Sequence, residues 1–254
     1  MIPKKIHFCW YGNGSYNDTI KKCIASWEEK LPDYEIKKWD ESNTPFDRLP
    51  FLKLLYKQKK WSFITDYMRL YSIYTEGGIY LDTDIEILKD FGALLEEEAF
   101  VGFQTDLEDS IYPLNSAVIG ANKGNEFVLD CIKETERKQR LHFNAMGGPP
   151  IVSNVILKKY GVDEYKTQTV NDVKILTTDY FFPFSWLEEY SPACITENTV
   201  CIHWWEDSWR NKKKGASYYL DSIKRKLQKL PLLISDRIKY KMQKERFYHI
   251  INLT

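Results

Sequence analysis

Residues 61–84 constrain what this chain can fold into more than any other segment. A helical pattern ends at two glycines, a short apolar run predicts a strand, and Asp82 and Asp84 come directly after it. Because alternate residues of a strand point to the same side, we expect the two carboxylates to share a face while Thr83 points away. Two adjacent carboxylates repel each other unless a cation lies between them. The segment therefore predicts a site for a hard divalent metal, which commonly also holds a substrate phosphate.

The composition is that of a globular chain rich in aromatic residues. Its 254 residues can bury the core of one large domain or of one and a half. Aromatic residues make up 15%, and although most such side chains fill cores, flat aromatic faces also suit sugar rings and nucleobases. The five cysteines have no CxxC spacing, which argues against a disulfide framework or zinc knuckle and indicates a reducing cytoplasm. The first residues lead straight into a strand-like run, so we expect neither a signal peptide nor a membrane span.

Charge is spread unevenly although the formal net charge is zero. Residues 211–254 carry 12 Lys and Arg against 3 Asp and Glu, a net of +9, while the rest of the chain carries 24 against 33. This tail holds two helical patterns broken at Pro231, the first with one apolar face and basic residues around it. We predict a basic amphipathic helix that lies on an anionic membrane surface. A docked C-terminal helix with solvated cations is an equal alternative.

Strand and helix patterns alternate along most of the chain. The opening is typical of a strand over 6–10, a helix over 18–30 capped by Asn17, and a strand over 34–39, which is the start of an α/β fold with a parallel sheet. Further strands are predicted at 100–104, 117–120, 173–176 and 200–205, and further helices at 61–76, 125–137 and 151–159.

Asp66 and Arg69 stand three residues apart on the helix that precedes the two glycines, so they share a face. One interpretation is a surface ion pair worth a few tenths of a kcal/mol. The other is a polar clamp on a hydroxylated ligand. An Asp-x-Asp pair is weak evidence alone, but ligands of open α/β sheets do bind beyond the carboxyl ends of strands, where this pair stands. A second acidic group, Asp106, Glu108 and Asp109, is more typical of a solvated loop.

Five stretches, in order, resemble a known family. The opening at 2–10 is followed by matches at 65–69, 77–84, 115–120 and 202–209. Together they resemble glycosyltransferase family 32, whose sugar-binding region contains a DXD motif. That family includes capsular polysaccharide and lipopolysaccharide enzymes of bacteria, and its core is similar to that of the large glucosylating toxins. The resemblance implies a GT-A fold over residues 1–210: one Rossmann-like nucleotide-sugar domain with a mixed central sheet, followed by the basic helical extension at 211–254.

The resemblance also implies which residues hold the nucleotide sugar. Trp10 matches a position whose indole stacks on the nucleobase. Asp66 and Arg69 match the pair that holds the hydroxyls of the donor sugar, and Tyr80 matches an aromatic residue beside the donor.

The predicted metal site combines both aspartates with a residue near the end of the match. By resemblance, Asp82 reaches the ribose or the metal and Asp84 ligates the metal directly. His203 fits the third contact to the metal or diphosphate, with Glu206 and Asp207 as alternatives. Without the resemblance, His203 is more typical of a core histidine at a strand end.

Ser208 and Trp209 match a mobile loop that closes over the diphosphate. Negative charge grows on the leaving diphosphate during glycosyl transfer, and a divalent cation held by carboxylates stabilises that charge. A Trp-bearing lid would exclude water and so prevent hydrolysis of the donor.

The sequence therefore predicts a hexosyltransferase dependent on Mn²⁺ or Mg²⁺. We expect UDP-galactose or UDP-glucose as donor, with retention of configuration. The expected acceptor is a surface glycan that is lipid-linked at the inner face of the cell membrane, and we expect no nucleic-acid partner. GDP-mannose is the alternative donor. A metal-dependent nucleotidyltransferase or phosphotransferase is less favoured because no GxxxxGK loop is present, and a carbohydrate-binding protein without activity would not need both aspartates.

Overall fold

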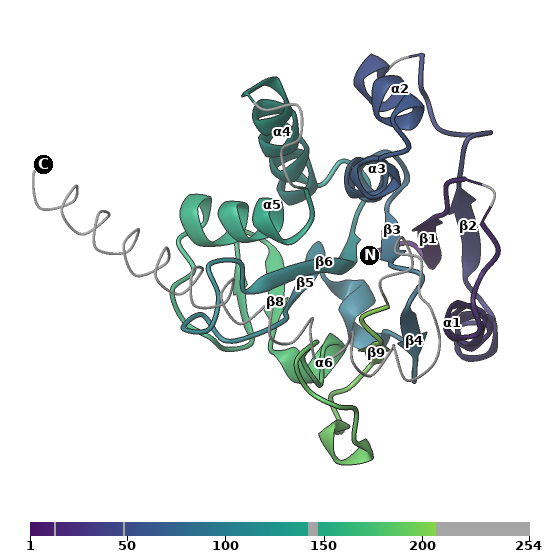
Figure 1. Ribbon diagram of the computed structural model, residues 1–254. Helices are drawn as coiled ribbons and strands as arrows, with labels where there is room; N and C mark the ends of the chain where they lie inside the picture. The colour runs from purple at the N-terminus through teal and green to yellow at the C-terminus, as the bar shows by residue number, and fades with distance from the viewer. Residues whose placement is uncertain (13, 48, 142–146, 207–254) are drawn as a thin grey trace, which may run out of the picture.

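The protein is a mixed α/β structure built around one central sheet (Figure 1). The computed structural model describes residues 1–206 apart from 13, 48 and 142–146. Within these residues, nine strands form a seven-stranded sheet and a two-stranded sheet. The strands are β1 (Lys5–Cys9), β2 (Glu35–Trp39), β3 (Gly78–Leu81), β4 (Ile85–Ile87), β5 (Ala99–Phe103), β6 (Leu114–Ala121), β7 (Gln168–Val170), β8 (Val173–Leu176) and β9 (Cys201–His203).

Helices cover both faces of the central sheet (Figure 1). The α-helices are α1 (Asp18–Lys30), α2 (Pro50–Lys57), α3 (Trp61–Glu76), α4 (Glu126–Leu141), α5 (Pro149–Ser153) and α6 (Thr178–Phe181). Shorter turns are the 3-10 helices η1 (Gly92–Glu96) and η3 (Pro192–Cys194) and the π-helix η2 (Asn154–Lys159), which continues α5. No helix of the described residues is both long and apolar enough to cross a membrane.

The central sheet has the order β2-β1-β3-β6-β5-β8-β7. Strand β1 runs parallel to β2 and β3, and β5 runs parallel to β8. Strand β6 is antiparallel to both β3 and β5, so the sheet is mixed. Residues of β3, β5 and β6 are buried along their whole length. Strands β3 and β5 are therefore continuous apolar runs in the sequence, as strands covered on both faces are, whereas β6 also buries the polar residues Asn115 and Ser116.

The core consists of two apolar clusters, one on each face of the sheet. One contains Met68 of α3 and Phe127 of α4, and the other contains Trp27 of α1 and Phe181 of α6. The helix predictions that depended on apolar spacing are confirmed: α1 and α3 have the predicted bounds. Asn17 is the predicted N-cap of α1, since its Oδ1 accepts a hydrogen bond of 2.8 Å from the backbone N–H of Ile20.

The turn from α3 into β3 requires glycine. Gly78 has φ +111°, and a Cβ at this position would lie 2.6 Å from the carbonyl oxygen of Lys5. His7, which is fully buried, makes a hydrogen bond of 2.8 Å to the carbonyl oxygen of Gly77 and accepts another from Trp39. These hydrogen bonds fix the turn against β1 and β2. The end of β3 therefore lies close to the face of α3 that carries Arg69.

The prediction that Asp82 and Asp84 continue a strand is wrong, because both lie in a turn after the strand. Strand β3 ends at Leu81, and the backbone N–H of Ile85 donates to the carbonyl oxygen of Asp82 in a turn. The chain has to reverse here because β4 leaves the central sheet and pairs with β9 instead. Thr83 therefore does not point away from the site but shares its wall, as described below.

Several other elements differ from the prediction. The helix predicted over 151–159 begins at Pro149 and becomes a π-helix at Asn154, and the short elements α2, β4, β7 and α6 were not predicted. The predicted tail at 211–254 lies outside the described residues, as do Asp207, Ser208 and Trp209. The division at residue 210 stays a prediction for the same reason.

Candidate functional site

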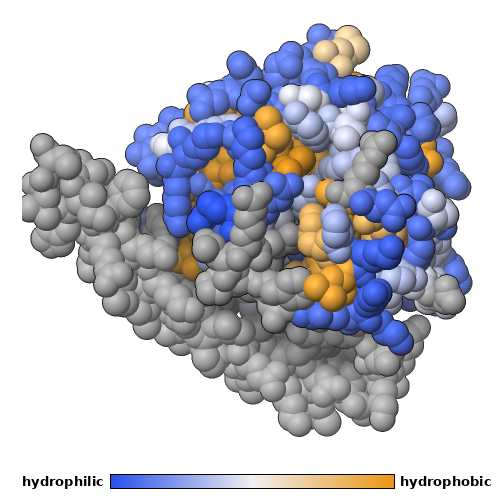
Figure 2. All heavy atoms as spheres, turned by 90° about the horizontal axis from the view of Figure 1, so that it is seen from above, coloured by the Kyte–Doolittle hydropathy of each residue, from blue (hydrophilic) through white to orange (hydrophobic). Residues whose placement is uncertain are grey.

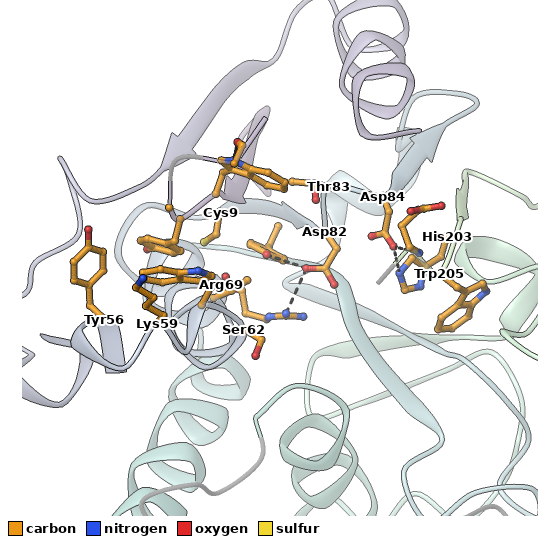
Figure 3. A pocket seen from close by; sticks show the side chains of 18 of the residues that line it. Cys9, Tyr56, Lys59, Ser62, Arg69, Asp82, Thr83, Asp84, His203 and Trp205 are labelled. Carbon is orange, nitrogen blue, oxygen red and sulfur yellow. Dashed lines mark hydrogen bonds and ion pairs between the residues drawn. The ribbon is translucent and has the colours of Figure 1, made fainter. Parts of the chain in front are cut away.

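An open cavity of about 1030 Å³ lies beside the C-terminal ends of β1 and β3 (Figure 3). Its volume is at the upper end of the range of about 300–1,000 Å³ that small-molecule sites occupy. Four groups of residues form the walls: 9–12 and Gly14 after β1; Tyr56, Lys57, Lys59, Trp61, Ser62, Thr65 and Arg69 around α2 and α3; Tyr80, Asp82, Thr83 and Asp84 at the end of β3; and Trp186, His203, Trp205 and Glu206 from the last part of the described chain.

Three metal-ligating side chains meet at one end of this cavity. One ligand atom each of Asp82, Asp84 and His203 lies within 4.8 Å of the other two. Pairing of β4 with β9 causes this, because it places Ile85 opposite His203 and so brings the histidine to the turn that carries the aspartates. Figure 3 shows the imidazole of His203 turned toward Asp84. The predicted aspartates and the predicted histidine, far apart in sequence, are thus together.

Asp84 is held as a carboxylate by its surroundings. It is buried, and its Oδ2 lies 3.2 Å from Nε2 of His203 and accepts a hydrogen bond of 2.7 Å from the backbone N–H of Glu206. Burial acts to raise the pKa of Asp84, but His203 and the backbone N–H groups outweigh it, so the pKa lies below its ordinary value. An ionised, buried carboxylate is a strong ligand for a hard cation.

The donor set suits a divalent metal. Two carboxylates and one imidazole give oxygen and nitrogen ligands, and Nδ1 of His203 is buried without a hydrogen-bond partner among the described residues. The imidazole packs against the indole of Trp205, with ring centroids 4.1 Å apart, and against Phe182, which restricts its rotation. The residues present therefore fit Mn²⁺ or Mg²⁺ bound by Asp82, Asp84 and His203.

Arg69 joins α3 to the end of β3 and to β6. Its guanidinium donates to the carbonyl oxygen and hydroxyl of Ser116, at 2.8 and 2.6 Å, and pairs with Asp66 at 3.0 Å and Asp82 at 3.3 Å. Only 8% of the side chain is exposed. The ion pair of Arg69 with Asp66 is therefore not the surface pair considered above, since it is part of a buried polar network that fixes the orientation of Asp82.

Tyr80 completes this network. Its hydroxyl donates a hydrogen bond of 2.9 Å to Asp82 Oδ1, and its ring lies 4.9 Å from the guanidinium carbon of Arg69. Burial, together with the charge of Asp82, raises the pKa of Tyr80 well above its ordinary value, so the hydroxyl remains a donor. Asp82 is thus held from two sides at the wall of the cavity, and its predicted contact with the ribose or the metal stays a prediction.

Asp66 lies behind Arg69 and against Gly147 and Gly148, the residues directly before α5. Asp66 is not among the described residues that line the cavity. Its predicted contact with the donor sugar therefore stays a prediction. A Cβ on Gly147 would lie 2.4 Å from Cβ of Asp66, so only glycine permits this approach of the loop. Burial raises the pKa of Asp66 to about 6, and the charge of Asp82 adds to the rise while Arg69 opposes it.

Replacing Asp66 by asparagine is expected to stabilise the protein at alkaline pH. Because the folded-state pKa of about 6 lies above the ordinary value of 3.8, the favourable contribution of Asp66 is full below pH 3.8 and is lost as the pH rises through 6. We expect D66N to be more stable than the wild type at pH 8 by on the order of 1–2 kcal/mol. This advantage should shrink on acidification, as measured by urea unfolding at a series of pH values.

Asp40 provides the opposite control. Hydrogen bonds from Ser42 and Lys38 lower the pKa of Asp40 to about 2, so its contribution is present above pH 3.8 and lost below it. The variant D40N should therefore be less stable than the wild type at pH 8. A D66N variant that loses stability at every pH would contradict the interpretation of Asp66.

Trp10 stands on the cavity wall that follows β1. Its indole N–H donates a hydrogen bond of 2.8 Å to the carbonyl oxygen of Gly14, and its ring contacts Tyr16 edge-on at 4.7 Å between centroids. The indole is therefore held in position by the turn after β1. This location is compatible with the predicted stacking on a nucleobase, which stays a prediction.

The segment leaving β9 is fastened to the aspartate turn and to α1. The backbone N–H of Trp204 donates to the carbonyl oxygen of Asp84, and Nδ2 of Asn17 donates to the carboxylate of Glu206 at 3.2 Å. Asn17 thus caps α1 and also holds Glu206 at the cavity. Of the alternatives for the third metal contact, His203 is in the cluster of ligand atoms and Glu206 lines the cavity beside it.

Several cavity residues were missed by the sequence interpretation. Trp61 and Thr65 precede Arg69 at four-residue spacing and share its helix face, so this stripe could have been found from the sequence. Trp186 and Lys59 gave no such signal, because they lie in connections between elements. The acidic loop containing Asp106, in contrast, does not contribute to this cavity.

Comparison with known proteins identifies the fold of this chain and a family model that matches part of it. A family model described as glycosyltransferase sugar-binding region containing DXD motif matches residues 17–101. Among solved structures, the apo form of the glycosyltransferase GlyE of Streptococcus pneumoniae has a TM-score of 0.50 at 13% identity, covering 95% of this chain and 64% of that one. The chain thus has the GT-A fold, and its residues 17–101 are similar to a DXD-containing sugar-binding region.

Three curated relatives are similar to part of the chain. Lactosylceramide 4-alpha-galactosyltransferase of Rattus norvegicus is 27% identical over 65% of this chain and 44% of its own length. Inositol phosphoceramide mannosyltransferase 3 of Schizosaccharomyces pombe is 29% identical over 54% and 38%, and Subversion of eukaryotic traffic protein A of Legionella pneumophila is 28% identical over 50% and 24%. The chain therefore spans less than half the length of each of these relatives.

Proposed function

We propose that this protein is a metal-dependent glycosyltransferase that moves a hexose from a nucleotide diphosphate sugar to a glycan acceptor. The observation that carries the proposal is the meeting of Asp82, Asp84 and His203, within 4.8 Å of one another, at the wall of a cavity large enough for a nucleotide sugar. The family match to a DXD sugar-binding region supports the same assignment. A carbohydrate-binding protein without activity would have no need for this ligand set.

In the proposed reaction, three residues bind the metal and two others orient one of these ligands. A divalent metal bound by Asp82, Asp84 and His203 would neutralise the negative charge that grows on the leaving diphosphate. Arg69 and Tyr80 hold Asp82 in its orientation through an ion pair of 3.3 Å and a hydrogen bond of 2.9 Å, respectively. This preorganisation matters because a ligand that must reorient during the reaction stabilises the charge less.

Aromatic residues around the cavity supply the binding surface. Trp10 and Trp61 line it on the side of β1 and α3, while Trp186 and Trp205 line it on the side of the last strand. Flat apolar faces suit a nucleobase or a sugar ring, and they also limit access of water, which would otherwise hydrolyse the donor.

The donor we propose is UDP-galactose or UDP-glucose, with retention of configuration at the transferred sugar. One relative is by name a galactosyltransferase and another a mannosyltransferase, which supports a hexose and keeps GDP-mannose as the alternative donor. For the acceptor we propose a surface glycan of the capsular or lipopolysaccharide kind in a bacterium, lipid-linked at the cytoplasmic face of the membrane. The net charge of +9 in residues 211–254 supports peripheral binding there.

A donor panel tests the function. The purified protein is incubated with Mn²⁺ and a set of nucleotide sugars, and release of free nucleotide is measured with and without EDTA. We expect slow release of UDP from one hexose donor, lost on chelation and regained with Mn²⁺ or Mg²⁺. Release of GDP from GDP-mannose alone would favour the alternative donor. Absence of both turnover and donor binding across the panel would contradict the proposed function.

A further inference from the structure

A second cavity, separate from the first, lies between α4 and the end of η2. Its volume is about 600 Å³, and it shares no lining residue with the cavity at the aspartates. Figure 2 shows hydrophilic residues around apolar patches on the face seen from above Figure 1, on the side of α2, α3 and α4. The lining includes five cationic side chains from two elements: Lys133, Arg137 and Lys138 of α4, and Lys158 and Lys159 of η2.

The two acidic residues of this cavity are already engaged. Glu134 binds the guanidinium of Arg137 through two hydrogen bonds of 2.8 and 2.9 Å, and its carboxylate also lies 3.8 Å from Lys138. Asp130 pairs with Lys159 at 2.5 Å and accepts a hydrogen bond of 2.8 Å from the hydroxyl of Tyr160. The acids therefore neutralise only part of the positive charge.

Lys133 and Lys158 line the cavity together with the other three cations. Unlike those cations, they form no ion pair with any described residue. They come from different elements, so the fold rather than the sequence brings them to one cavity. Counting the lining residues, five cations face two carboxylates, an excess of three positive charges in a concave surface. Such a surface concentrates the electrostatic field and attracts anions.

The neighbouring cations affect the pKa of Lys138, whose side chain is 22% exposed. Burial is the largest cause that lowers the pKa of Lys138, and the charges of Lys158 and Arg137 lower it further although Glu134 opposes them. The cations thus repel one another across the cavity. A bound anion with several charges would relieve this repulsion.

We propose that the cavity between α4 and η2 binds a phosphate-bearing polyanion through Lys133 and Lys158, with Arg137, Lys138 and Lys159 around it. A ligand with two phosphates, such as a diphosphate, matches this arrangement because it presents several acceptor oxygens and more than one negative charge to cations that come from two sides. The source is either the headgroup of an anionic lipid or a soluble phosphate compound. The proposal does not depend on the function proposed for the first cavity.

Inorganic pyrophosphate is the probe that tests this site. Titrations of the full chain are followed by isothermal calorimetry in EDTA, so that no metal links pyrophosphate to the aspartates. We expect saturable binding that is weakened about tenfold in Lys133→Gln/Lys158→Gln, because two charge-assisted hydrogen bonds are lost. The variant Lys133→Arg/Lys158→Arg keeps both charges and should retain binding.

A matched control is Lys21→Gln/Lys30→Gln, which removes two exposed cations from α1 and should leave the affinity unchanged. All four lysines are exposed, so folding is checked simply by the melting temperature. Absence of saturable binding, or equal affinity in the wild type and Lys133→Gln/Lys158→Gln, would overturn the proposal. Equal weakening in the control pair would show a general charge effect and would overturn it as well.

Vesicles distinguish the two sources of phosphate. Co-sedimentation is compared for phosphatidylcholine vesicles with and without cardiolipin, whose headgroup carries two phosphates and is therefore a polyanion. If the double glutamine variant sediments less with the anionic vesicles, and pyrophosphate displaces the wild type from them, the site takes a lipid headgroup. If the variant loses pyrophosphate binding but sediments like the wild type, the site takes a soluble phosphate compound.

Discussion

Replacing Arg69 by alanine should lower the free energy of unfolding by about 3–5 kcal/mol, as expected when one partner of a buried charge network is removed. Arg69 is 8% exposed and pairs with both Asp66 and Asp82 while donating twice to Ser116. Its removal leaves two carboxylates facing each other without a counter-charge. Urea unfolding at pH 8, well above the raised pKa of Asp66, measures the effect at its largest.

Two variants separate the charge of Arg69 from its shape. Arg69→Lys keeps the charge but not the planar fork that reaches Ser116 and both aspartates, so we expect an intermediate loss of stability. Arg137→Ala removes an arginine whose ion pair with Glu134 lies on the surface, and it should leave the unfolding midpoint nearly unchanged. A loss in Arg69→Ala no greater than that in Arg137→Ala would show that the network does not stabilise the fold.

Replacing Asp84 by asparagine should reduce donor turnover by a factor of about 10²–10³, the range seen when one group that stabilises charge in a transition state is removed. Asparagine has nearly the same shape and can still accept the hydrogen bond from the backbone N–H of Glu206. It lacks the negative charge that a divalent cation requires. The affinity for Mn²⁺, measured by calorimetry without donor, should therefore fall together with the turnover.

Glu86 offers the matched control for Asp84. It lies two residues further along the chain, pairs with Lys22 at 2.8 Å and accepts a hydrogen bond from the indole of Trp204, and it does not line the cavity. Glu86→Gln should therefore leave the affinity for Mn²⁺ unchanged. Equal Mn²⁺ affinity in the wild type and in Asp84→Asn would refute the assignment of Asp84 as a ligand.

Elements with strong local signals could be predicted from the sequence. Helix α1 has an asparagine N-cap and apolar residues at helical spacing. Helix α3 ends at a pair of glycines, which is the signal of a turn with positive φ angles. Both have the predicted bounds. Strands β3 and β5 are apolar, which is typical of strands buried on both faces, and β6 is apolar from Ala117 onward.

Elements whose partners are distant in sequence could not be predicted. Strand β4 has three residues and pairs only with β9, more than a hundred residues later, among the described strands. Without that pairing, the apolar run before Asp82 looked like a strand that continues through Asp84. The prediction that Thr83 points away from the two aspartates assumed the alternation of a strand, and it was wrong for this reason. The two carboxylates do lie together as predicted.

The sequence alone determined the chemical inventory: the aspartate pair, the helix face with Asp66 and Arg69, and a family resemblance that indicates a nucleotide sugar. Only the tertiary structure decided how these groups are arranged. It placed His203 against Asp84 through β4 and β9, put Asp66 behind Arg69, and brought Lys133 and Lys158 to one cavity. The reason is physical: spacing along the chain fixes which side chains share a face of one element, whereas contacts between elements depend on packing of the whole sheet and its helices.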